Sequence, residues 1–243
     1  MSQNIYDNPT FFAGYATLPL SVEGLDGAPE WPALRAMLPD LNDLRVVDLG
    51  CGYGWFCRYA QQHGAREILG IDVSEKMLAQ ATAMTSSPNI RYQRADLETL
   101  QLDKTYDLAY SSLALHYLSH IESLFTTLFD ALKPGGMLIF SCEHPIYTAP
   151  LQQQWIVDDQ QQRSWPINHY QQEGDRISNW FADGVKKQHR KLASWINALI
   201  GAGFEIVHLD EWGPADEQVK QNPGLEEERD RPMMFLLSAR KPQ

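Results

Sequence analysis

The sequence predicts an α/β protein whose sheet is mostly parallel and carries helices on both faces. Short apolar segments, expected to be strands, alternate with segments expected to be helices between residues 45 and 142. Parallel neighbours require crossover connections, and these connections place helices on both faces of a sheet. The 243 residues suffice for one such domain with an inserted cap.

Capping residues and chain breakers define where these elements begin and end. Ser74 is expected to cap one helix, while Gly64 and Gly203 close two others. Pro32 fits the first turn of a helix, and another helix stops before Pro134. Strands are expected at 45–49, 67–71, 90–94, 106–110, 136–142, 204–209 and 233–239, and helices at 31–38, 55–63, 74–84, 121–132 and 191–202.

Composition divides the chain into four segments. Residues 1–44 hold aromatic residues punctuated by proline and glycine, which predicts a lid of short helices. Residues 45–144 carry the strand–helix alternation of the core. Residues 145–187 are aromatic and polar, and they predict antiparallel hairpins inserted as a cap over the C-terminal edge of the sheet, where ligands bind in open α/β folds. Residues 188–243 return to a helix and two strands.

Charge and cysteine content narrow the class of function. Twenty basic and 31 acidic side chains give a formal charge of −11, which opposes general affinity for nucleic acid and favours a small-molecule partner. Three cysteines without paired spacing indicate neither a disulfide framework nor a zinc site, so no metal is expected. No apolar run approaches the roughly 18 residues of a membrane span. We therefore predict a cytoplasmic protein without a membrane segment.

The most informative motif is the run Val46-Val47-Asp48-Leu49-Gly50-Cys51-Gly52-Tyr53-Gly54. Glycines at a strand-to-helix turn let the backbone pass close to a ligand and adopt positive φ, and the following helix offers free amides. A dinucleotide site needs a glycine where this chain has Trp55, and no Gly-Lys-Ser/Thr follows for a phosphate-binding loop. Both of these nucleotide readings are therefore disfavoured.

The run resembles the Asp-x-Gly-x-Gly-x-Gly signature of class I S-adenosylmethionine-dependent methyltransferases. Asp72 ends the second expected strand, where a carboxylate can accept both hydroxyl hydrogens of a ribose. Further segments resemble later motifs of this family in the expected order, over about residues 45–142: Arg94-Ala95-Asp96, Tyr106 to Ser112, and Leu132-Lys133-Pro134-Gly135-Gly136. The resemblance implies a Rossmann-like fold with a seven-stranded, mostly parallel sheet whose last strand is antiparallel.

The resemblance also implies S-adenosylmethionine as the cofactor, S-adenosylhomocysteine as its product, and a set of contacts. The glycine turn would hold the amino-acid end, with Asp48 ordering the turn, while Asp72 would hold the ribose. Tyr6 and Tyr15 would close over the cofactor from the lid, their alternative role being plain packing. The expected cofactor-binding residues are Asp48, Gly50, Cys51, Gly52, Gly54, Asp72, Val73, Met77, Asp96, Leu97, Ser111, Ser112, Tyr15 and Tyr6.

The methyl acceptor is less well defined by the sequence. His144 and His116 are the candidate catalytic bases, because they follow the fifth and fourth expected strands. The expected substrate-binding residues are Glu143, Tyr170, His189 and Arg190, the arginine for its fit to a planar anion. The aromatic residues of the cap fit either a cover over an apolar or aromatic molecule or a homodimer contact.

The expected function is methyl transfer from S-adenosylmethionine to an oxygen, nitrogen or carbon atom of a small molecule by in-line displacement. Two alternatives stay open on the same fold. One is a methyltransferase directed at RNA or protein, and the other is a protein that binds S-adenosylmethionine without turnover. A nicotinamide oxidoreductase is disfavoured by Trp55.

Overall fold

One sheet organises the chain. The computed structural model describes residues 3–243, and within them seven strands form a sheet in the order β10-β11-β5-β4-β1-β2-β3. All its strands run parallel except β11, which is antiparallel to both of its neighbours. The strands are β1 (Arg45–Leu49), β2 (Glu67–Asp72), β3 (Ile90–Arg94), β4 (Tyr106–Ser112), β5 (Leu132–Glu143), β10 (Glu205–Glu211) and β11 (Met234–Arg240). The predicted fold class, including its antiparallel last strand, is confirmed.

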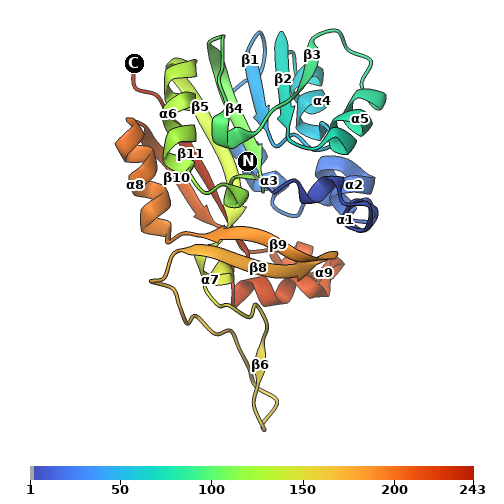
Figure 1. Cartoon of the computed structure of the whole chain (residues 1–243), viewed down its shortest axis with the longest axis vertical. Helices are drawn as coiled ribbons and strands as arrows, with labels where there is room; N and C mark the ends of the chain where they lie inside the picture. The colour runs from blue at the N-terminus through green and yellow to red at the C-terminus, as the bar shows by residue number, and fades with distance from the viewer. Residues whose placement is uncertain (1–2) are drawn as a thin grey trace.

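Helices cover both faces of the sheet, as predicted (Figure 1). Side chains of one strand alternate between two separate cores, so Val47 packs with the cluster under α6 and α8 while Val46 packs with the cluster under α3 and α4. The helices are α3 (Trp31–Met37), α4 (Trp55–Gln62), α5 (Glu75–Ala83), α6 (Ile121–Ala131) and α8 (Leu192–Ala202).

Helix ends follow the local chemistry that the sequence contains. The Ser74 side chain accepts a hydrogen bond from the Met77 amide at the start of α5, and Gly203 ends α8 in the left-handed conformation with φ +102°. Pro134 cannot continue a helix, and α6 ends at Ala131, one residue before its predicted end, because the chain is already extended at Leu132. None of the described helices is long and apolar enough to cross a membrane.

Short helices precede the sheet, as the proline and glycine pattern predicts. The Asn8 side chain accepts hydrogen bonds from two amides at the start of α1, and Pro9 occupies the first position of that helix. These elements lie beside the ends of the strands (Figure 1). They are η1 (Ile5–Asp7), α1 (Pro9–Tyr15), α2 (Pro19–Glu23) and η2 (Gly24–Gly27), followed by α3.

The segment after β5 forms antiparallel hairpins, as predicted, but only one of them covers the sheet. The hairpin of β8 (Gly174–Trp180) and β9 (Ala182–His189) lies across the end of the sheet toward which β5 points, whereas the small hairpin of β6 (Ile156–Val157) and β7 (Arg163–Ser164) projects away (Figure 1). A short helix, α7 (Pro145–Thr148), leads into this segment.

Short elements in the loops were not anticipated. The segment between the last two strands of the chain was predicted without structure, yet it folds into α9 (Asp216–Gln221) and η5 (Pro223–Arg229). Two single turns, η3 (Leu97–Thr99) and η4 (Leu115–Tyr117), follow β3 and β4. These pieces are too brief to show a helical period, so nothing in the sequence distinguished them from loops.

Candidate cofactor and acceptor site

The turn after β1 requires its glycines. Gly50, Gly52 and Gly54 have φ values of +71°, +50° and +71°, a region that side-chain-bearing residues rarely adopt. A Cβ atom at Gly50 would also overlap the Cβ of Ala114, which follows β4. The turn therefore lies directly against the loop after β4, and the backbone of Gly50 and Gly52 faces a large cavity.

Asp72 fastens this turn to the end of β2. One carboxylate oxygen accepts the Gly52 amide at 2.9 Å, and the other accepts the Ser74 amide at 2.9 Å. Burial raises the pKa of Asp72, while these backbone hydrogen bonds act to lower it. Asp72 also lines the cavity.

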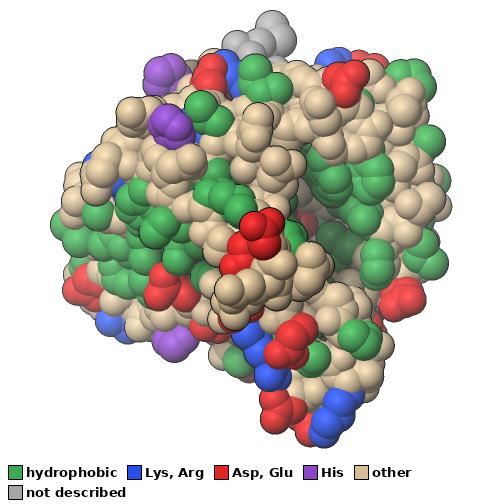
Figure 2. Space-filling model, turned by 90° about the horizontal axis from the view of Figure 1, so that it is seen from below, with side chains coloured by type: hydrophobic (Ala, Val, Ile, Leu, Met, Phe, Trp, Pro, Cys, Tyr) green, Lys and Arg blue, Asp and Glu red, His purple; other side chains and the backbone are tan. Residues whose placement is uncertain are grey.

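This cavity has a volume of about 1300 Å³. Seen from below, the molecule is hollowed here and hydrophobic side chains surround the opening (Figure 2). We call the end formed by Gly50, Gly52, Asp72 and Asp96 the turn side, and the end formed by Glu143, Tyr147, Trp180, Lys187 and Met233 the cap side.

The structure gathers most of the predicted cofactor-binding residues around this cavity. The predicted residues that line it are Tyr6, Tyr15, Gly50, Gly52, Asp72, Val73, Met77, Asp96, Leu97 and Ser112. Asp48 and Cys51 instead line a small pocket behind the turn, and burial raises the pKa of Asp48 to about 7. Gly54 packs against Tyr92, and the Ser111 hydroxyl donates to the Leu49 carbonyl at 2.8 Å, so these two residues support the turn from outside the cavity.

Tyr6 and Tyr15 stack edge to face at the N-terminal wall of the cavity, with ring centroids 5.3 Å apart. The Tyr6 hydroxyl lies 3.3 Å from the hydroxyl of Tyr117, which belongs to η4. Burial raises the pKa of both Tyr6 and Tyr15 well above the usual tyrosine value. Both hydroxyls are therefore protonated at physiological pH and are available as hydrogen-bond donors.

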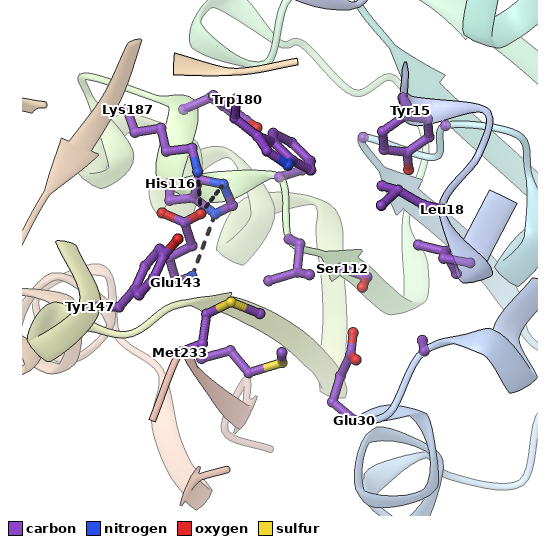
Figure 3. A pocket seen from close by; sticks show the side chains of 18 of the residues that line it. Tyr15, Leu18, Glu30, Ser112, His116, Glu143, Tyr147, Trp180, Lys187 and Met233 are labelled. Atoms are coloured by element: carbon purple, nitrogen blue, oxygen red, sulfur yellow. Dashed lines mark hydrogen bonds and ion pairs between the residues drawn. The ribbon is translucent and has the colours of Figure 1, made fainter. Parts of the chain in front are cut away.

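Glu143, His116 and Lys187 form a polar cluster on the cap side (Figure 3). Lys187 donates to Glu143, and both side chains are nearly covered, at 6 % and 11 % exposed. Burial alone would raise the pKa of Glu143, but Lys187 and His116 hold it below its usual value. Burial lowers the pKa of His116 to about 4, so this histidine is neutral at physiological pH.

The neutral His116 has a defined tautomer. Its Nδ1 accepts the backbone amide of Glu143 at 3.5 Å, so its proton is on Nε2, which lies 4.0 Å from a Glu143 carboxylate oxygen. The other oxygen of Glu143, Oε2, is buried without a hydrogen-bond partner among the described atoms. The cluster therefore offers a carboxylate whose position is fixed from two sides.

Four predicted acceptor-site residues, His144, Tyr170, His189 and Arg190, lie outside the lining of the cavity, and their roles stay predictions. His144 caps α7, with Nδ1 accepting the Ile146 amide and Nε2 2.8 Å from Glu211. His189 is fully buried, and its two ring nitrogens contact the Thr148 hydroxyl and the Tyr170 carbonyl. Arg190 donates to the carbonyls of Leu118 and Ser119 instead of facing a ligand. The Tyr170 ring packs on His189 at 5.7 Å.

Sequence reasoning missed several residues of the cavity. Lys187, Tyr147 and Met233 carry no local signature, because only the fold brings them together. Glu30 also lines the cavity, although it is only 2 % exposed. It lies at the N-cap of α3. Asparagine, aspartate, serine or threonine is preferred at that position, so a glutamate there was the one available signal of another role.

Comparisons with known proteins agree with this geometry. A sequence model described as a methyltransferase domain matches residues 46–136. A crystal structure of an S-adenosylmethionine-dependent methyltransferase from Mesorhizobium loti is 55 % identical, covers 90 % of this chain and 100 % of its own, and superposes with a TM-score of 0.86. A Haemophilus influenzae protein described as uncharacterized is 34 % identical over 98 % of this chain and 97 % of its own.

A more distant relative has a named activity. Trans-aconitate 2-methyltransferase from Deinococcus radiodurans is 39 % identical over 106 residues, which are 43 % of this chain and 40 % of that protein. This match is partial, whereas the Mesorhizobium structure matches 90 % of this chain. The chain belongs to the class I S-adenosylmethionine-dependent methyltransferases.

Proposed function

We propose that this methyltransferase transfers the methyl group of S-adenosylmethionine to a small molecule that binds on the cap side of the cavity. The observation that carries this proposal is the size of the cavity. Pockets for one drug-sized ligand measure roughly 300–1,000 Å³, and this cavity measures about 1300 Å³. The space therefore suits the cofactor together with a second small molecule.

The turn side fits the cofactor. In this proposal the backbone of Gly50 and Gly52 holds the amino-acid end, Asp72 accepts the ribose hydroxyls, and Asp96 and Leu97 flank the adenine. The cofactor supplies a methyl group on a positively charged sulfur, so the protein's task is to position the two molecules and exclude water. The tyrosine ring of Tyr15 presents a face that suits a positive charge.

The cap side fits the acceptor. Tyr147, Trp180 and Met233 give it apolar walls, and the Glu143–Lys187 pair gives it a polar end (Figure 3). Glu143 is the group best placed to accept a hydrogen bond, and then the proton, from a hydroxyl or amine acceptor. His116 holds the Glu143 backbone and stays neutral, so it serves to position that carboxylate.

The charge of the lining argues against nucleic acid and other polyanions. Six acidic residues line the cavity, and Lys187, its one lysine, is already paired with Glu143. Like charges disfavour a polyanionic acceptor by Coulomb repulsion. Trans-aconitate, the substrate in the name of the Deinococcus relative, is such a polyanion, so we expect a neutral or cationic acceptor instead.

The test offers methyl-labelled S-adenosylmethionine and a cell extract to the purified enzyme. The extract is then separated into small-molecule, protein and RNA fractions. We expect label in the small-molecule fraction, and we expect the Asp72→Ala variant to lose it. Label in protein or RNA would assign a macromolecular target instead. If S-adenosylhomocysteine binds but no fraction acquires label, the protein is a binder without turnover.

A further inference from the structure

Glu30 is a buried carboxylate that faces the cavity and has no cationic partner among residues 3–243. The residue is 2 % exposed, and its carboxylate points into the space between Ser112 and Met233 (Figure 3). Burial raises the pKa of Glu30, and a hydrogen bond from its own backbone amide lowers it. No charged side chain contributes to the shift. Buried carboxylates are normally paired or hydrogen-bonded, so this one calls for a ligand.

The backbone holds Glu30 firmly in this place. Its carbonyl accepts the amides of Ala33 and Leu34 at 3.1 Å as the first bonds of α3. The preceding Pro29 carbonyl accepts the side-chain amide of Gln218 from α9 at 2.6 Å. The following Trp31 packs edge to face on Tyr59 at 4.8 Å. The backbone that carries Glu30 is therefore fixed by contacts on both sides of the residue.

Glu30 also lies on the turn side of the molecule. It lines the small pocket behind the turn together with Gly50, Gly52 and Ser112, and it belongs to the wall of the large cavity as well. The other titratable groups of the small pocket are Asp48, Tyr15, Tyr110, Tyr53 and Cys51. None of these groups carries a positive charge, so a cation bound here has only acceptors and neutral hydroxyl or thiol groups around it.

Burial raises the pKa of Glu30 to about 7, so about half of the ligand-free molecules carry it protonated at neutral pH. An opposite charge within about 4–6 Å favours the ionised form of a carboxylate. A cationic ligand that binds beside Glu30 must therefore drive its proton off. That coupling distinguishes contact with a cation from a purely structural role.

We propose that Glu30 binds the α-ammonium group of S-adenosylmethionine and S-adenosylhomocysteine. The amino-acid end of the cofactor carries this ammonium, and the glycine turn that shares the pocket with Glu30 is the segment that holds this end. Glu30, at the N-cap of α3, thus binds one functional group of the cofactor from outside the Rossmann-like core. This assignment rests on the cofactor alone and holds for any methyl acceptor.

The first test measures the affinity of two ligands by isothermal titration on the wild type, the Glu30→Gln variant and a control variant. The ligands are S-adenosylhomocysteine and an analogue in which hydrogen replaces the α-amine. We expect Glu30→Gln to weaken S-adenosylhomocysteine about tenfold or more and to leave the analogue unchanged within about twofold. Glu122→Gln is the matched control, because Glu122 is an exposed carboxylate of α6 that lies outside the cavity lining, and it should change neither affinity.

The second test measures proton release when S-adenosylhomocysteine binds, by titration near pH 6.5 in buffers of different ionisation enthalpy. The wild type should release a fraction of a proton that Glu30→Gln no longer releases. Asp48 is a second possible source of the proton, because its pKa is also raised to about 7. Proton release is therefore measured on Asp48→Asn as well. Equal weakening of both ligands by Glu30→Gln, no weakening of either, or undiminished proton release in Glu30→Gln would each overturn the proposal.

Discussion

The turn side of the cavity is built from backbone at the ends of neighbouring strands, whereas the cap side is built from side chains that lie far apart in the sequence. On the turn side, Gly50, Gly52 and Asp72 come from adjacent strands, and the Asp72 carboxylate bonds directly to the Gly52 amide. On the cap side, Glu143, Lys187 and Met233 come from a strand end, a hairpin and a loop. A local pattern therefore encodes the first side, and only the complete fold assembles the second.

This difference predicts how the two sides respond to substitution. Changes on the turn side should impair cofactor binding whatever the acceptor. Changes on the cap side should alter the acceptor's KM and leave cofactor affinity intact. The predictions below use S-adenosylhomocysteine affinity for the turn side, the KM of an acceptor for the cap side, and, for Glu30, the stability of the ligand-free protein.

The largest effect is expected for Gly50→Ala. The new Cβ would overlap Ala114 and force a residue with a side chain to φ +71°, so the turn must move. We expect S-adenosylhomocysteine to bind about 100-fold more weakly, a loss of roughly 2.7 kcal/mol, by isothermal titration. Gly184→Ala is the matched control, because Gly184 has φ +76° but no neighbour near its added Cβ. Equal losses in both variants would show that backbone strain alone is responsible.

Glu30→Gln should change the pH dependence of stability. The folded-state pKa of Glu30 is raised from 4.5 to about 7, so the wild type loses stability as pH rises from the lower value to the higher. We expect the variant to match the wild type near pH 4.5 and to exceed it by about 3 kcal/mol at pH 8, in urea denaturation of the ligand-free protein. A difference that does not vary with pH would contradict this account.

Trp165→Ala should weaken the acceptor and spare the cofactor. The Trp165 ring stacks on Tyr147 at 5.7 Å, and its indole nitrogen donates to the Ile146 carbonyl at 2.8 Å. Removing the ring frees Tyr147, which lines the cap side. We expect the acceptor's KM to rise by roughly fivefold, about 1 kcal/mol, with unchanged S-adenosylhomocysteine affinity. Weakened cofactor binding would mean that the two sides are not independent.

Tyr6→Phe should have the smallest effect. It removes the hydroxyl that lies 3.3 Å from Tyr117 and keeps the ring that packs on Tyr15. We expect S-adenosylhomocysteine affinity to fall by less than about threefold, because the lost hydrogen bond joins Tyr6 to Tyr117 and a weak neutral hydrogen bond of about 0.5 kcal/mol corresponds to only about twofold. A loss of tenfold or more would show that the Tyr6 hydroxyl contacts the cofactor directly.

The elements of the core were predictable because their signals are local. The strand at 90–94 was predicted with the bounds that β3 has, and Ser74 and Gly203 cap helices as their residue types indicate. Gly50, Gly52, Asp72 and Asp96 were expected to share one site, and they line one cavity. Strand periodicity, capping and glycine conformation are properties of a few neighbouring residues, so one sequence suffices to read them.

The cap side was less predictable because burial and pairing depend on distant segments. His189 and Arg190 were expected to contact the substrate. In the fold, His189 contacts a hydroxyl and a backbone carbonyl, and Arg190 donates to two backbone carbonyls from another part of the chain. Lys187 was not expected, although it supplies the charge that holds Glu143. On the turn side, Glu30 was missed for the same reason, because α9, itself not predicted, holds the loop before α3.

The most direct test of the account is titration of S-adenosylhomocysteine into the wild type and the Asp72→Ala variant. Asp72 both fixes the glycine turn and faces the proposed ribose position, so its loss should act on cofactor binding before any acceptor is known. We predict clear binding to the wild type and an affinity lower by tenfold or more in the variant, about 1.4 kcal/mol. Equal affinity in the two folded proteins, or no binding to the wild type, would contradict the proposed cofactor site.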